Sequence, residues 1–192
     1  MFCVVYCTAK SGSTLTMKIL ERFGWPVAMD LHHTVRESGE LRNALRDCYM
    51  GVSATAWSVM EKSQTDIHGR WCLKVPNIVL PVADIRHDYP DHKAIYLFRD
   101  PAGIAKRDLT IKNRRNTLNQ TIGHQMEMYW MYSEDADKSF VLSYEKLLST
   151  PRRELRHLAI YLDTPVESSV INDIATHIKP EVGYVELKDV PE

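Results

Sequence analysis

The feature that most constrains this sequence is its start, where an apolar run leads into a loop of small residues and then into a helical pattern. Residues 2–7 (Phe-Cys-Val-Val-Tyr-Cys) are rich in β-branched and aromatic side chains, which is typical of a strand buried on both faces. The loop Lys10-Ser11-Gly12-Ser13-Thr14 follows, and Leu15, Ile19 and Phe23 then recur at helical spacing. Backbone N–H groups converge at such a loop and helix N-terminus, so the sequence predicts an anion site there.

The loop carries groups that suit a phosphate, but it differs from the loop that binds nucleoside triphosphates. Gly12 lets the backbone approach an anion closely, Ser13 and Thr14 offer hydroxyls, and Lys10 adds a positive charge. The triphosphate pattern is GxxxxGK[ST]. When Gly12-Ser13-Thr14 is aligned with its last three positions, Ser13 replaces the lysine and Cys7 replaces the first glycine. The pattern therefore indicates a phosphate loop of another kind, and a strand-to-helix turn without a ligand is the alternative.

The rest of the chain alternates predicted strands with helical patterns. The strands are expected at about 2–7, 27–31, 70–75, 93–98 and 139–143, and the clearest helices at 152–163 and 116–132. Such alternation predicts an α/β fold, a three-layer sandwich with a mostly parallel sheet of about five strands. With 192 residues and no linker-like or repetitive segment, the chain is expected to form a single domain over 1–192.

Three cationic side chains are expected to meet at one edge of this sheet. Lys10, Lys74 and Arg99 each lie at or just after the end of a predicted strand. In open parallel sheets, ligands bind beyond the carboxyl ends of the strands. The placement predicts an anion-binding edge. For Arg99, which precedes Asp100-Pro101, a structural Arg–Asp pair is the alternative.

Composition excludes some partners. The formal net charge is −1, so total charge does not favour nucleic acid or an anionic membrane. No apolar run approaches the roughly 20 residues of a membrane-spanning helix. The chain starts on its first predicted strand, and its four cysteines show no CxxC spacing, so we expect reduced buried thiols in a cytoplasmic protein and no metal site.

Three blocks of the sequence, in this order, resemble sulfotransferases that use 3′-phosphoadenosine-5′-phosphosulfate (PAPS). Lys10-Ser11-Gly12-Ser13-Thr14-Leu15 resembles the family's 5′-phosphosulfate loop. Lys74-Val75-Pro76, followed by residues 89–101, resembles its "K-x-P … F-P-D-A-K-hydrophobic-R-D-P" pattern. Ser143-Tyr144-Glu145 and the leucine-rich segment after Pro151 resemble its "R-Y-E-D-L … P … L-x-x-L" block. The resemblance covers most of residues 3–163 and implies a P-loop-like fold.

The resemblance also implies cofactor-binding roles for individual residues. Residues 10–15 would hold the 5′ side of PAPS or of its product, adenosine 3′,5′-bisphosphate (PAP). Arg99, with Lys106 or Arg107, would bind the 3′-phosphate, since a guanidinium can grip a phosphate with two parallel hydrogen bonds. Tyr144 would lie near the adenine. The alternative for Tyr144 is a tyrosine that only packs at a strand end.

The sequence departs from the family pattern at four places. Arg107 stands where the family commonly has a serine that helps to hold the 3′-phosphate. Pro76 stands where the cytosolic subgroup has a histidine base, and Leu15 where that subgroup has a tryptophan. The basic, glycine-containing motif that closes over the cofactor in some members is not evident after Ile178. The chain is therefore closer to the non-cytosolic or bacterial type.

The implied reaction needs charge stabilisation and a base. Sulfuryl transfer resembles phosphoryl transfer, in which catalysis is mainly positioning and electrostatics. Lys10 is the expected partner of the leaving phosphate, and Lys74 is implied as a second cation near the transferred group. In the non-cytosolic members of the family, a Glu or His after the second strand usually serves as the base that activates the acceptor. The resemblance therefore implies Glu37 and His33, which follow the second predicted strand, as the first candidates.

The expected function is PAPS-dependent transfer of a sulfuryl group to a hydroxyl or amine of a small-molecule or glycan acceptor. One alternative is a magnesium-dependent kinase that transfers phosphate from ATP on the same fold. Another is a nucleotide-binding module without catalysis. Selectivity for the acceptor is expected to lie in the loops rather than in the fold.

Overall fold

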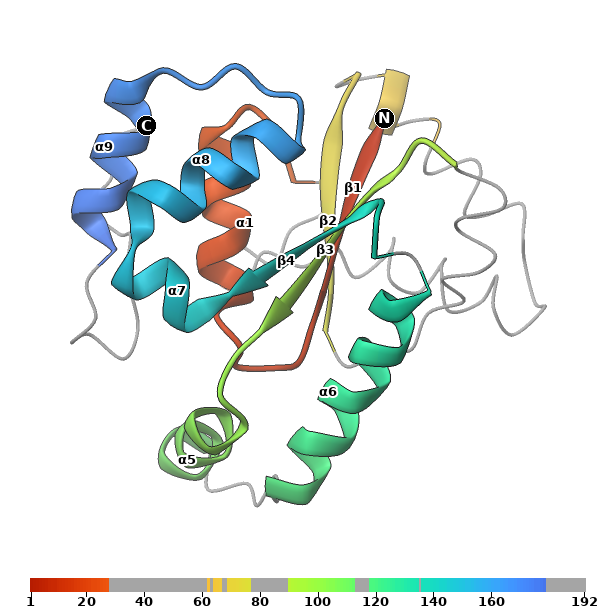
Figure 1. Ribbon diagram of the computed structural model, residues 1–192, viewed down its shortest axis with the longest axis vertical. Coiled ribbons are helices and arrows are strands. Elements are labelled where there is room, and N and C mark those ends of the chain that lie inside the picture. The colour runs from red at the N-terminus through yellow and green to blue at the C-terminus, as the bar shows by residue number, and fades with distance from the viewer. Residues whose placement is uncertain are drawn as a thin grey trace.

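The computed structural model describes residues 1–27, 62, 64–66, 69–76, 90–112, 118–134 and 136–178. Its central element is a parallel sheet in the order β2-β1-β3-β4 (Figure 1). The strands are β1 (Phe2–Cys7), β2 (Trp71–Pro76), β3 (Lys93–Phe98) and β4 (Ser139–Ser143). The predicted α/β fold with a parallel sheet is confirmed.

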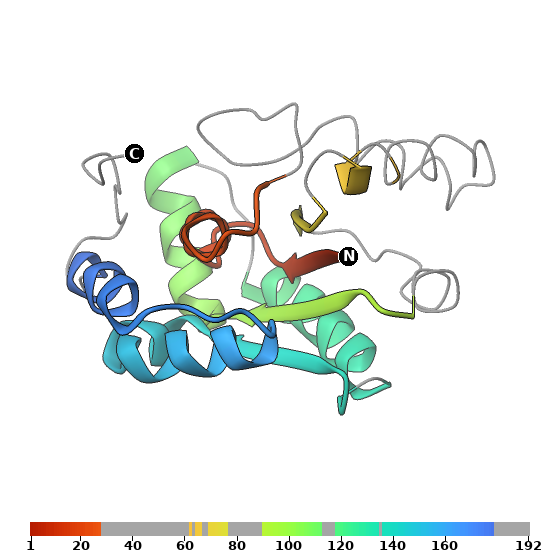
Figure 2. The same cartoon turned by 90° about the horizontal axis from the view of Figure 1, so that it is seen from above.

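Helices form the outer two layers. They are α1 (Ser13–Arg22), α5 (Pro101–Lys112), α6 (Leu118–Ser133), α7 (Tyr144–Ser149), α8 (Pro151–Tyr161) and α9 (Ser168–His177). Figure 1 and the view from above in Figure 2 both show α1, α7, α8 and α9 on one side of the sheet and α6 on the other. The predicted helices at 152–163 and 116–132 correspond to α8 and α6.

The position of β1 explains its composition. It pairs with β2 on one side and with β3 on the other, so both of its edges are hydrogen-bonded. All six of its side chains are buried. A strand in this position touches helices on both faces, which is why the sequence there is a continuous apolar run instead of an alternating one.

The two faces of the sheet are packed differently. On the α1 side, every second residue of β1 (Cys3, Val5 and Cys7) packs in a cluster with leucines and isoleucines of α1, α8 and α9. On the α6 side the packing is aromatic: Tyr6 stacks on Tyr96 with ring centroids 5.0 Å apart, and Tyr132 of α6 meets Tyr96 edge-on at 5.7 Å. The period-2 alternation of strand side chains produces both layers.

The number of strands differs from the prediction. The described residues contain four strands, whereas five were expected. Of the expected strand at 27–31, only Val27 is described, and it forms an isolated parallel bridge with Cys72 on β2. Residues 28–31 lie outside the described part of the chain. Val27 therefore lies beside β2, at the edge of that strand that faces away from β1.

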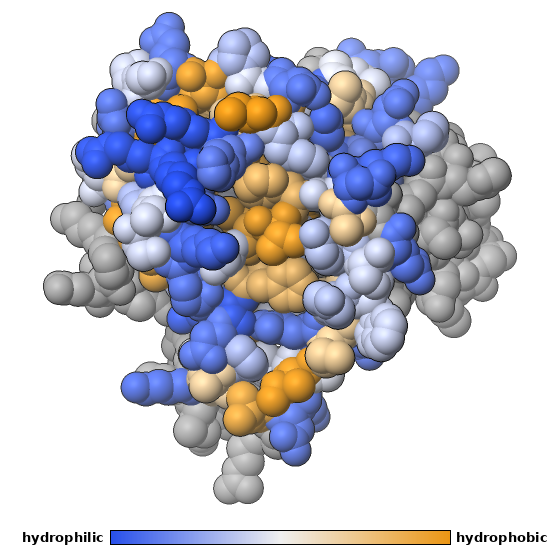
Figure 3. Space-filling model, in the orientation of Figure 1, coloured by the Kyte–Doolittle hydropathy of each residue, from blue (hydrophilic) through white to orange (hydrophobic). Residues whose placement is uncertain are grey.

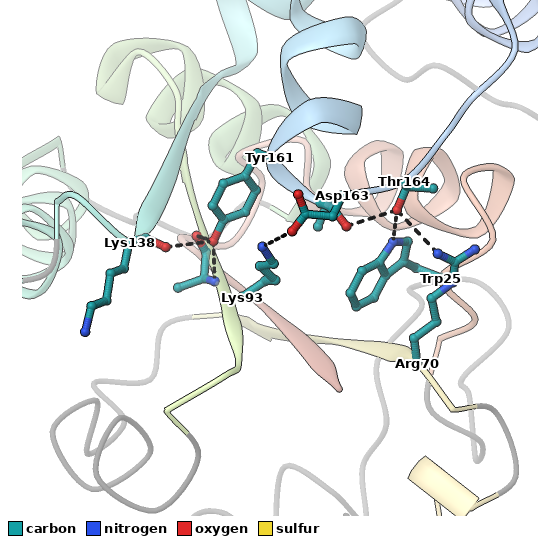
Figure 4. A network of polar contacts seen from close by, with 9 residues as sticks. Trp25, Arg70, Lys93, Lys138, Tyr161, Asp163 and Thr164 are labelled. Atoms are coloured by element: carbon teal, nitrogen blue, oxygen red, sulfur yellow. Dashed lines mark hydrogen bonds and ion pairs between the residues drawn. The ribbon is translucent and has the colours of Figure 1, made fainter.

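The amino end of the sheet is fastened by a network of polar contacts from the turn after α8 (Figure 4). Thr164 Oγ1 accepts hydrogen bonds from Trp25 Nε1 at 2.9 Å and from Arg70 NH1 at 3.5 Å. Asp163 accepts one from Lys93 Nζ at 2.7 Å, and the Tyr161 hydroxyl bonds to the backbone of Ala94. These contacts tie the C-terminal helices to the start of the strands.

One apolar stripe of α6 does not face the core. Ile122, Met126 and Tyr129 are 42%, 50% and 54% exposed, and Trp130 is also exposed. The buried face of α6 is formed instead by Thr121, Met128 and Met131. In Figure 3, apolar surface gathers where Figure 1 places β4 and α6.

In the described residues, the helices are too short or too polar to cross a membrane.

Candidate functional site

The carboxyl ends of the four described strands lie level with one another to within about one residue. Cys7, the last residue of β1, is in register with Pro76 on β2 and with Leu97 on β3. Phe98 is in turn in register with Ser143 at the end of β4. The segments that follow these strands therefore start at the same edge, and three of them carry predicted site residues.

The loop after β1 has a backbone that few residues adopt. Gly12, the N-cap of α1, has φ +98°, and Lys10 has φ +67°. Both values lie in the left-handed region, which glycine occupies freely and which other residues enter at a cost. Such strain at a non-glycine residue is typical of functional loops. The loop turns sharply enough to bring the first backbone N–H groups of α1 to the sheet edge.

Two buried hydroxyls in this loop suit an anion. Thr8 and Ser11 are 2% and 0% exposed. Neither Thr8 Oγ1 nor Ser11 Oγ has a hydrogen-bond partner among the described residues. A buried hydroxyl without a partner costs stability, so such groups in native structures usually bind a ligand or water. Both hydroxyls therefore fit a site that holds a phosphate or sulfate group.

The remaining loop residues contribute in different ways. Ser13 is buried and Thr14 is half-buried at the first turn of α1, where the helix leaves backbone N–H groups without intrahelical partners. The side chain of Leu15 belongs to the hydrophobic core, so only its backbone N–H can take part in anion binding. In the part of the chain that the structure describes, no group of three or more His, Cys, Asp and Glu side chains could hold a metal ion.

Arg99 joins the loop after β3 to the loop after β1. Its NH1 donates a hydrogen bond of 2.8 Å to the backbone oxygen of Lys10. A guanidinium has five N–H donors. Among the described residues, this bond is the one hydrogen bond that the Arg99 side chain donates. The cation expected to bind a phosphate thus lies directly beside the loop expected to bind another.

Tyr144, the first residue of α7, packs between these two groups. The Arg99 guanidinium carbon lies 4.4 Å from the centre of the Tyr144 ring, a cation–π geometry. The same ring contacts Gly12 so closely that a Cβ added there would lie 2.3 Å from Tyr144 Cδ2. Tyr144 is 8% exposed. Gly12 is therefore required by space as well as by backbone conformation.

The backbone at Arg99 is fixed from two further elements. Gln125 of α6 donates from Nε2 to the Arg99 backbone oxygen at 2.5 Å. Glu145 of α7 accepts the backbone N–H of Asp100 at 2.9 Å and the hydroxyl of Ser143 at 3.2 Å. The point where β3 leaves the sheet is held on both sides, so the position of Arg99 is well defined.

Asp100 is not the partner of the Arg99 guanidinium. Its carboxylate oxygens accept hydrogen bonds from the backbone N–H groups of Ala102 at 3.1 Å and Gly103 at 3.2 Å. This is the capping role that an aspartate plays at a helix N-terminus, here that of α5. The described residues contain no Arg99–Asp100 ion pair, so the alternative interpretation of Arg99 as half of a structural pair is wrong.

Lys74 lies inside β2 and not at its end. It pairs with Val5, two residues before the end of the strand, and is 2% exposed. By the alternation of strand side chains it shares a face with Cys72, which packs in the cluster on the α1 side. A lysine is rarely buried to this degree unless its charge is paired. The sheet holds Lys74 next to β1, but two residues back from the loop.

The other predicted site residues are not placed by the described structure. Glu37 and His33 lie outside the described residues, so their role as base stays a prediction. Arg107 belongs to α5, but its side chain is not among the described ones, and Lys106 on the same helix is exposed. The predicted roles of Lys106 and Arg107 also stay predictions.

Sequence reasoning missed three residues that shape the site. Thr8 was not among the predicted loop residues, although its position directly after the strand could have suggested it. Glu145 is acidic in the first turn of α7, a pattern typical of a helix start, but its bond to Asp100 crosses between two strand ends. Gln125 gives no local signal, because its partner Arg99 is 26 residues away in the sequence.

A family model described as "Sulfotransferase family" matches residues 49–168. This match covers more than half of the chain but begins after the loop that follows β1. The match therefore does not cover that loop, whose predicted role depends on its own sequence and geometry. No match was found among curated protein sequences.

Several sulfotransferases and a retinol dehydratase are among the solved structures with a similar fold, and some of them contain PAP. Retinol dehydratase in complex with androsterone and the inactive cofactor PAP has 15% identity and a TM-score of 0.56, covering 93% of this chain and 64% of that one. Mouse sulfotransferase SULT7A1 complexed with PAP has 14% identity, a TM-score of 0.58 and the same coverage of 93% and 64%. The sulfotransferase domain of the Synechococcus PCC 7002 olefin synthase has 18% identity and a TM-score of 0.52, covering 94% and 80%. At these identities the likeness shows the fold. The chain spans less than two thirds of the length of the first two.

Proposed function

The chain belongs to the sulfotransferase family, and from this premise we propose that it transfers a sulfuryl group from PAPS to a hydroxyl or amine acceptor and releases PAP. The acceptor is a small molecule or a glycan in this proposal. Retinol dehydratase and mouse sulfotransferase SULT7A1, which share the fold, were both solved with PAP.

The observation that carries the proposal is the contact between two anion-binding features at one sheet edge. The loop after β1 holds the buried hydroxyls of Thr8 and Ser11, and Arg99 donates to the backbone of Lys10 in that same loop. A nucleotide with phosphates at both its 5′ and 3′ positions needs two such features close together. A nucleoside triphosphate, whose phosphates form one chain, needs a single continuous cradle.

In the proposed complex, residues 10–15 and Thr8 hold the 5′ side of the nucleotide through backbone N–H groups and hydroxyls. Arg99, with Lys106 or Arg107, binds the 3′-phosphate. The ring of Tyr144 is packed against protein, so the hydroxyl is the part of this side chain that contacts the adenine in the proposal. These assignments combine the family resemblance with the geometry of the described residues.

Bound PAPS supplies a sulfuryl group whose bond to the 5′-phosphate breaks as the acceptor oxygen or nitrogen bonds to sulfur. Lys10 lies beside the 5′ loop and stabilises the negative charge that develops on the leaving phosphate. Lys74 adds positive charge in the neighbouring strand. The acceptor proton passes to a base, for which Glu37 and His33 are the proposed candidates.

The proposal is tested with PAPS that carries radioactive sulfur and a panel of alcohols, phenols, amines and glycans. We expect label to move to at least one acceptor with an equal amount of PAP released. Lys10→Ala should lower the transfer rate by about 100-fold, as loss of one group that stabilises a developing charge commonly does. Lys138→Ala, which removes an exposed lysine at the amino end of the sheet, is the matched control and should keep the rate.

Full transfer activity of Lys10→Ala would contradict the role given to Lys10. Transfer of phosphate from ATP with a strict magnesium requirement, and no transfer from PAPS, would contradict the proposal as a whole.

A further inference from the structure

We propose that Tyr144 is a positioning residue that sets the preference for a nucleotide with a 3′-phosphate, by holding the Arg99 guanidinium against the loop after β1. This inference rests on the proposed function, because it concerns the same nucleotide site. It differs from the role that the family resemblance implies for Tyr144, which is a contact with the adenine.

The geometry of the Tyr144 ring supports a positioning role. One part of the ring, at Cδ2 and Cε2, is in contact with Gly12, and the guanidinium of Arg99 lies over the ring at 4.4 Å from its centre. With 8% of the residue exposed, the ring offers little surface on which an adenine could stack. The large apolar part of Tyr144 is used within the protein, between the two anion-binding features.

The contacts form a closed chain of three groups. Tyr144 touches Gly12, Gly12 is two residues from Lys10, and the Lys10 backbone oxygen accepts the hydrogen bond from Arg99. Arg99 then returns to Tyr144 through the cation–π contact. Each of the three groups, the loop, Arg99 and Tyr144, therefore contacts the other two. The distance between the loop and the guanidinium is thereby fixed before a nucleotide binds.

Tyr144 affects only the guanidinium end of Arg99, because other residues hold the backbone there. The Arg99 backbone is held by Gln125, and the next peptide N–H by Glu145. Loss of the Tyr144 ring leaves these bonds in place. What changes is the freedom of the guanidinium, which has several rotatable bonds and would have to be ordered when a phosphate binds.

Fixing the guanidinium in advance favours one class of ligand. Adenosine 5′-phosphate (AMP) and PAP are identical except for the 3′-phosphate. Because Arg99 serves the 3′-phosphate, a preorganised Arg99 raises the affinity for PAP and leaves that for AMP nearly unchanged. The ratio of the dissociation constants of AMP and PAP therefore measures what Tyr144 contributes through Arg99.

The experiment is calorimetric titration of the full chain with PAP and with AMP. Tyr144→Phe keeps the ring and removes the hydroxyl, and should keep the AMP-to-PAP ratio within about twofold. Tyr144→Leu removes the ring and should lower the ratio by about fivefold, as expected when one flexible side chain has to be ordered on binding. Tyr129→Leu makes the same exchange at an exposed tyrosine on α6 and should keep the native ratio.

A double variant tests whether Tyr144 acts through Arg99. Arg99→Ala should lower the ratio by itself. If Tyr144 acts through the guanidinium, adding Tyr144→Leu to Arg99→Ala should lower the ratio no further. A further drop of fivefold or more in the double variant would show that Tyr144 acts on the 3′-phosphate by another route, and would overturn the inference.

Other outcomes separate this inference from the proposed function. If Tyr144→Leu weakens PAP and AMP equally, the residue acts through the adenine or the fold, and the inference is wrong. If the native protein does not prefer PAP to AMP at all, the proposed function fails first. Where Tyr144→Leu does not fold, Tyr144→Met is used with the same expectation, since the flexible methionine side chain fills irregular space.

Discussion

At the scale of single residues, the site depends on a glycine that could not be another residue. Gly12 combines a left-handed backbone with contact to the Tyr144 ring. The sequence indicated Gly12 as the residue that lets a backbone approach an anion. The structure adds that the space which a Cβ would need is filled by Tyr144, which is 132 residues further along the chain and gives no local signal.

Gly12→Ala should lower the free energy of unfolding by about 2 kcal/mol or more. The left-handed backbone alone costs about 1–2 kcal/mol for a residue with a Cβ, and the added carbon at 2.3 Å from Tyr144 Cδ2 forces a further shift. Denaturation by urea measures the change. Gly123→Ala is the matched control: it lies within α6, a Cβ there meets nothing within 4 Å, and the exchange should stabilise the protein by about 0.5–1 kcal/mol. An unchanged stability of Gly12→Ala would contradict the observed packing.

Two buried cysteines should make stability fall at alkaline pH. Burial raises the pKa of the Cys3 and Cys72 thiols above the ordinary value near 8.5. The unfolded chain therefore loses these protons at a lower pH than the folded protein does. The stabilisation is fully present below about pH 8.5 and is lost as the pH rises above it, by up to about 1.4 kcal/mol per pH unit for each thiol.

Urea denaturation at several pH values between about 8 and 10 measures this slope. The Cys3→Ala, Cys72→Ala double variant should be less stable throughout but should lose stability less steeply with pH. Equal slopes in the double variant and the native protein would show that the thiols do not cause the effect.

At the scale of the elements, the sequence predicted the positions of strands, which depend on local composition. The strands at 2–7, 93–98 and 139–143 agree with the structure residue for residue. For β1 and β3 the reason is that a strand buried on both faces must be apolar along its length. The exposed face of α6 could not be predicted in the same way. A stripe of Ile122, Met126 and Tyr129 at helical spacing shows that a helix has an apolar side, but not that another element covers that side.

The network at the amino end of the sheet was also beyond local prediction. Trp25 and Thr164 are separated by 139 residues, yet their side chains bond at 2.9 Å (Figure 4). Thr164 is 7% exposed and also donates to the Leu162 backbone oxygen at 3.1 Å. The sequence around Thr164 contains no pattern that predicts a hydrogen bond to a residue so distant in the chain.

Thr164→Val should destabilise the protein by about 1–3 kcal/mol. The exchange keeps the shape but removes the hydroxyl, so the buried Trp25 indole N–H loses its acceptor. Thr164→Ser keeps the hydroxyl and should recover most of the loss. The free energies of unfolding of both variants, from urea denaturation, give the result. Since the network lies at the edge opposite the proposed nucleotide site, PAP affinity should be unchanged in both. Equal stability of Thr164→Val and Thr164→Ser would contradict the importance of this bond.

At the scale of the whole molecule, the two ends of the sheet have different tasks. The amino end carries the contacts that join the C-terminal helices to the strands, and the carboxyl end carries the loop of Gly12, the guanidinium of Arg99 and the start of α7. The order of the strands brings the segments after β1, β3 and β4 together, although they are far apart in the sequence. The prediction of an anion-binding edge needed only the parallel sheet, but the three-way contact around Tyr144 needed the structure.

The most direct measurement is the thermal stability of the native chain and of Arg99→Ala with PAP, with ADP and with ATP–magnesium. A ligand that binds only the folded state raises its stability by RT ln(1 + [L]/Kd), about 2.7 kcal/mol at a hundredfold excess over Kd. We predict that PAP stabilises the native chain far more than ADP does, and that Arg99→Ala removes this difference. Stabilisation by ATP–magnesium without any effect of PAP would contradict the account and favour a kinase.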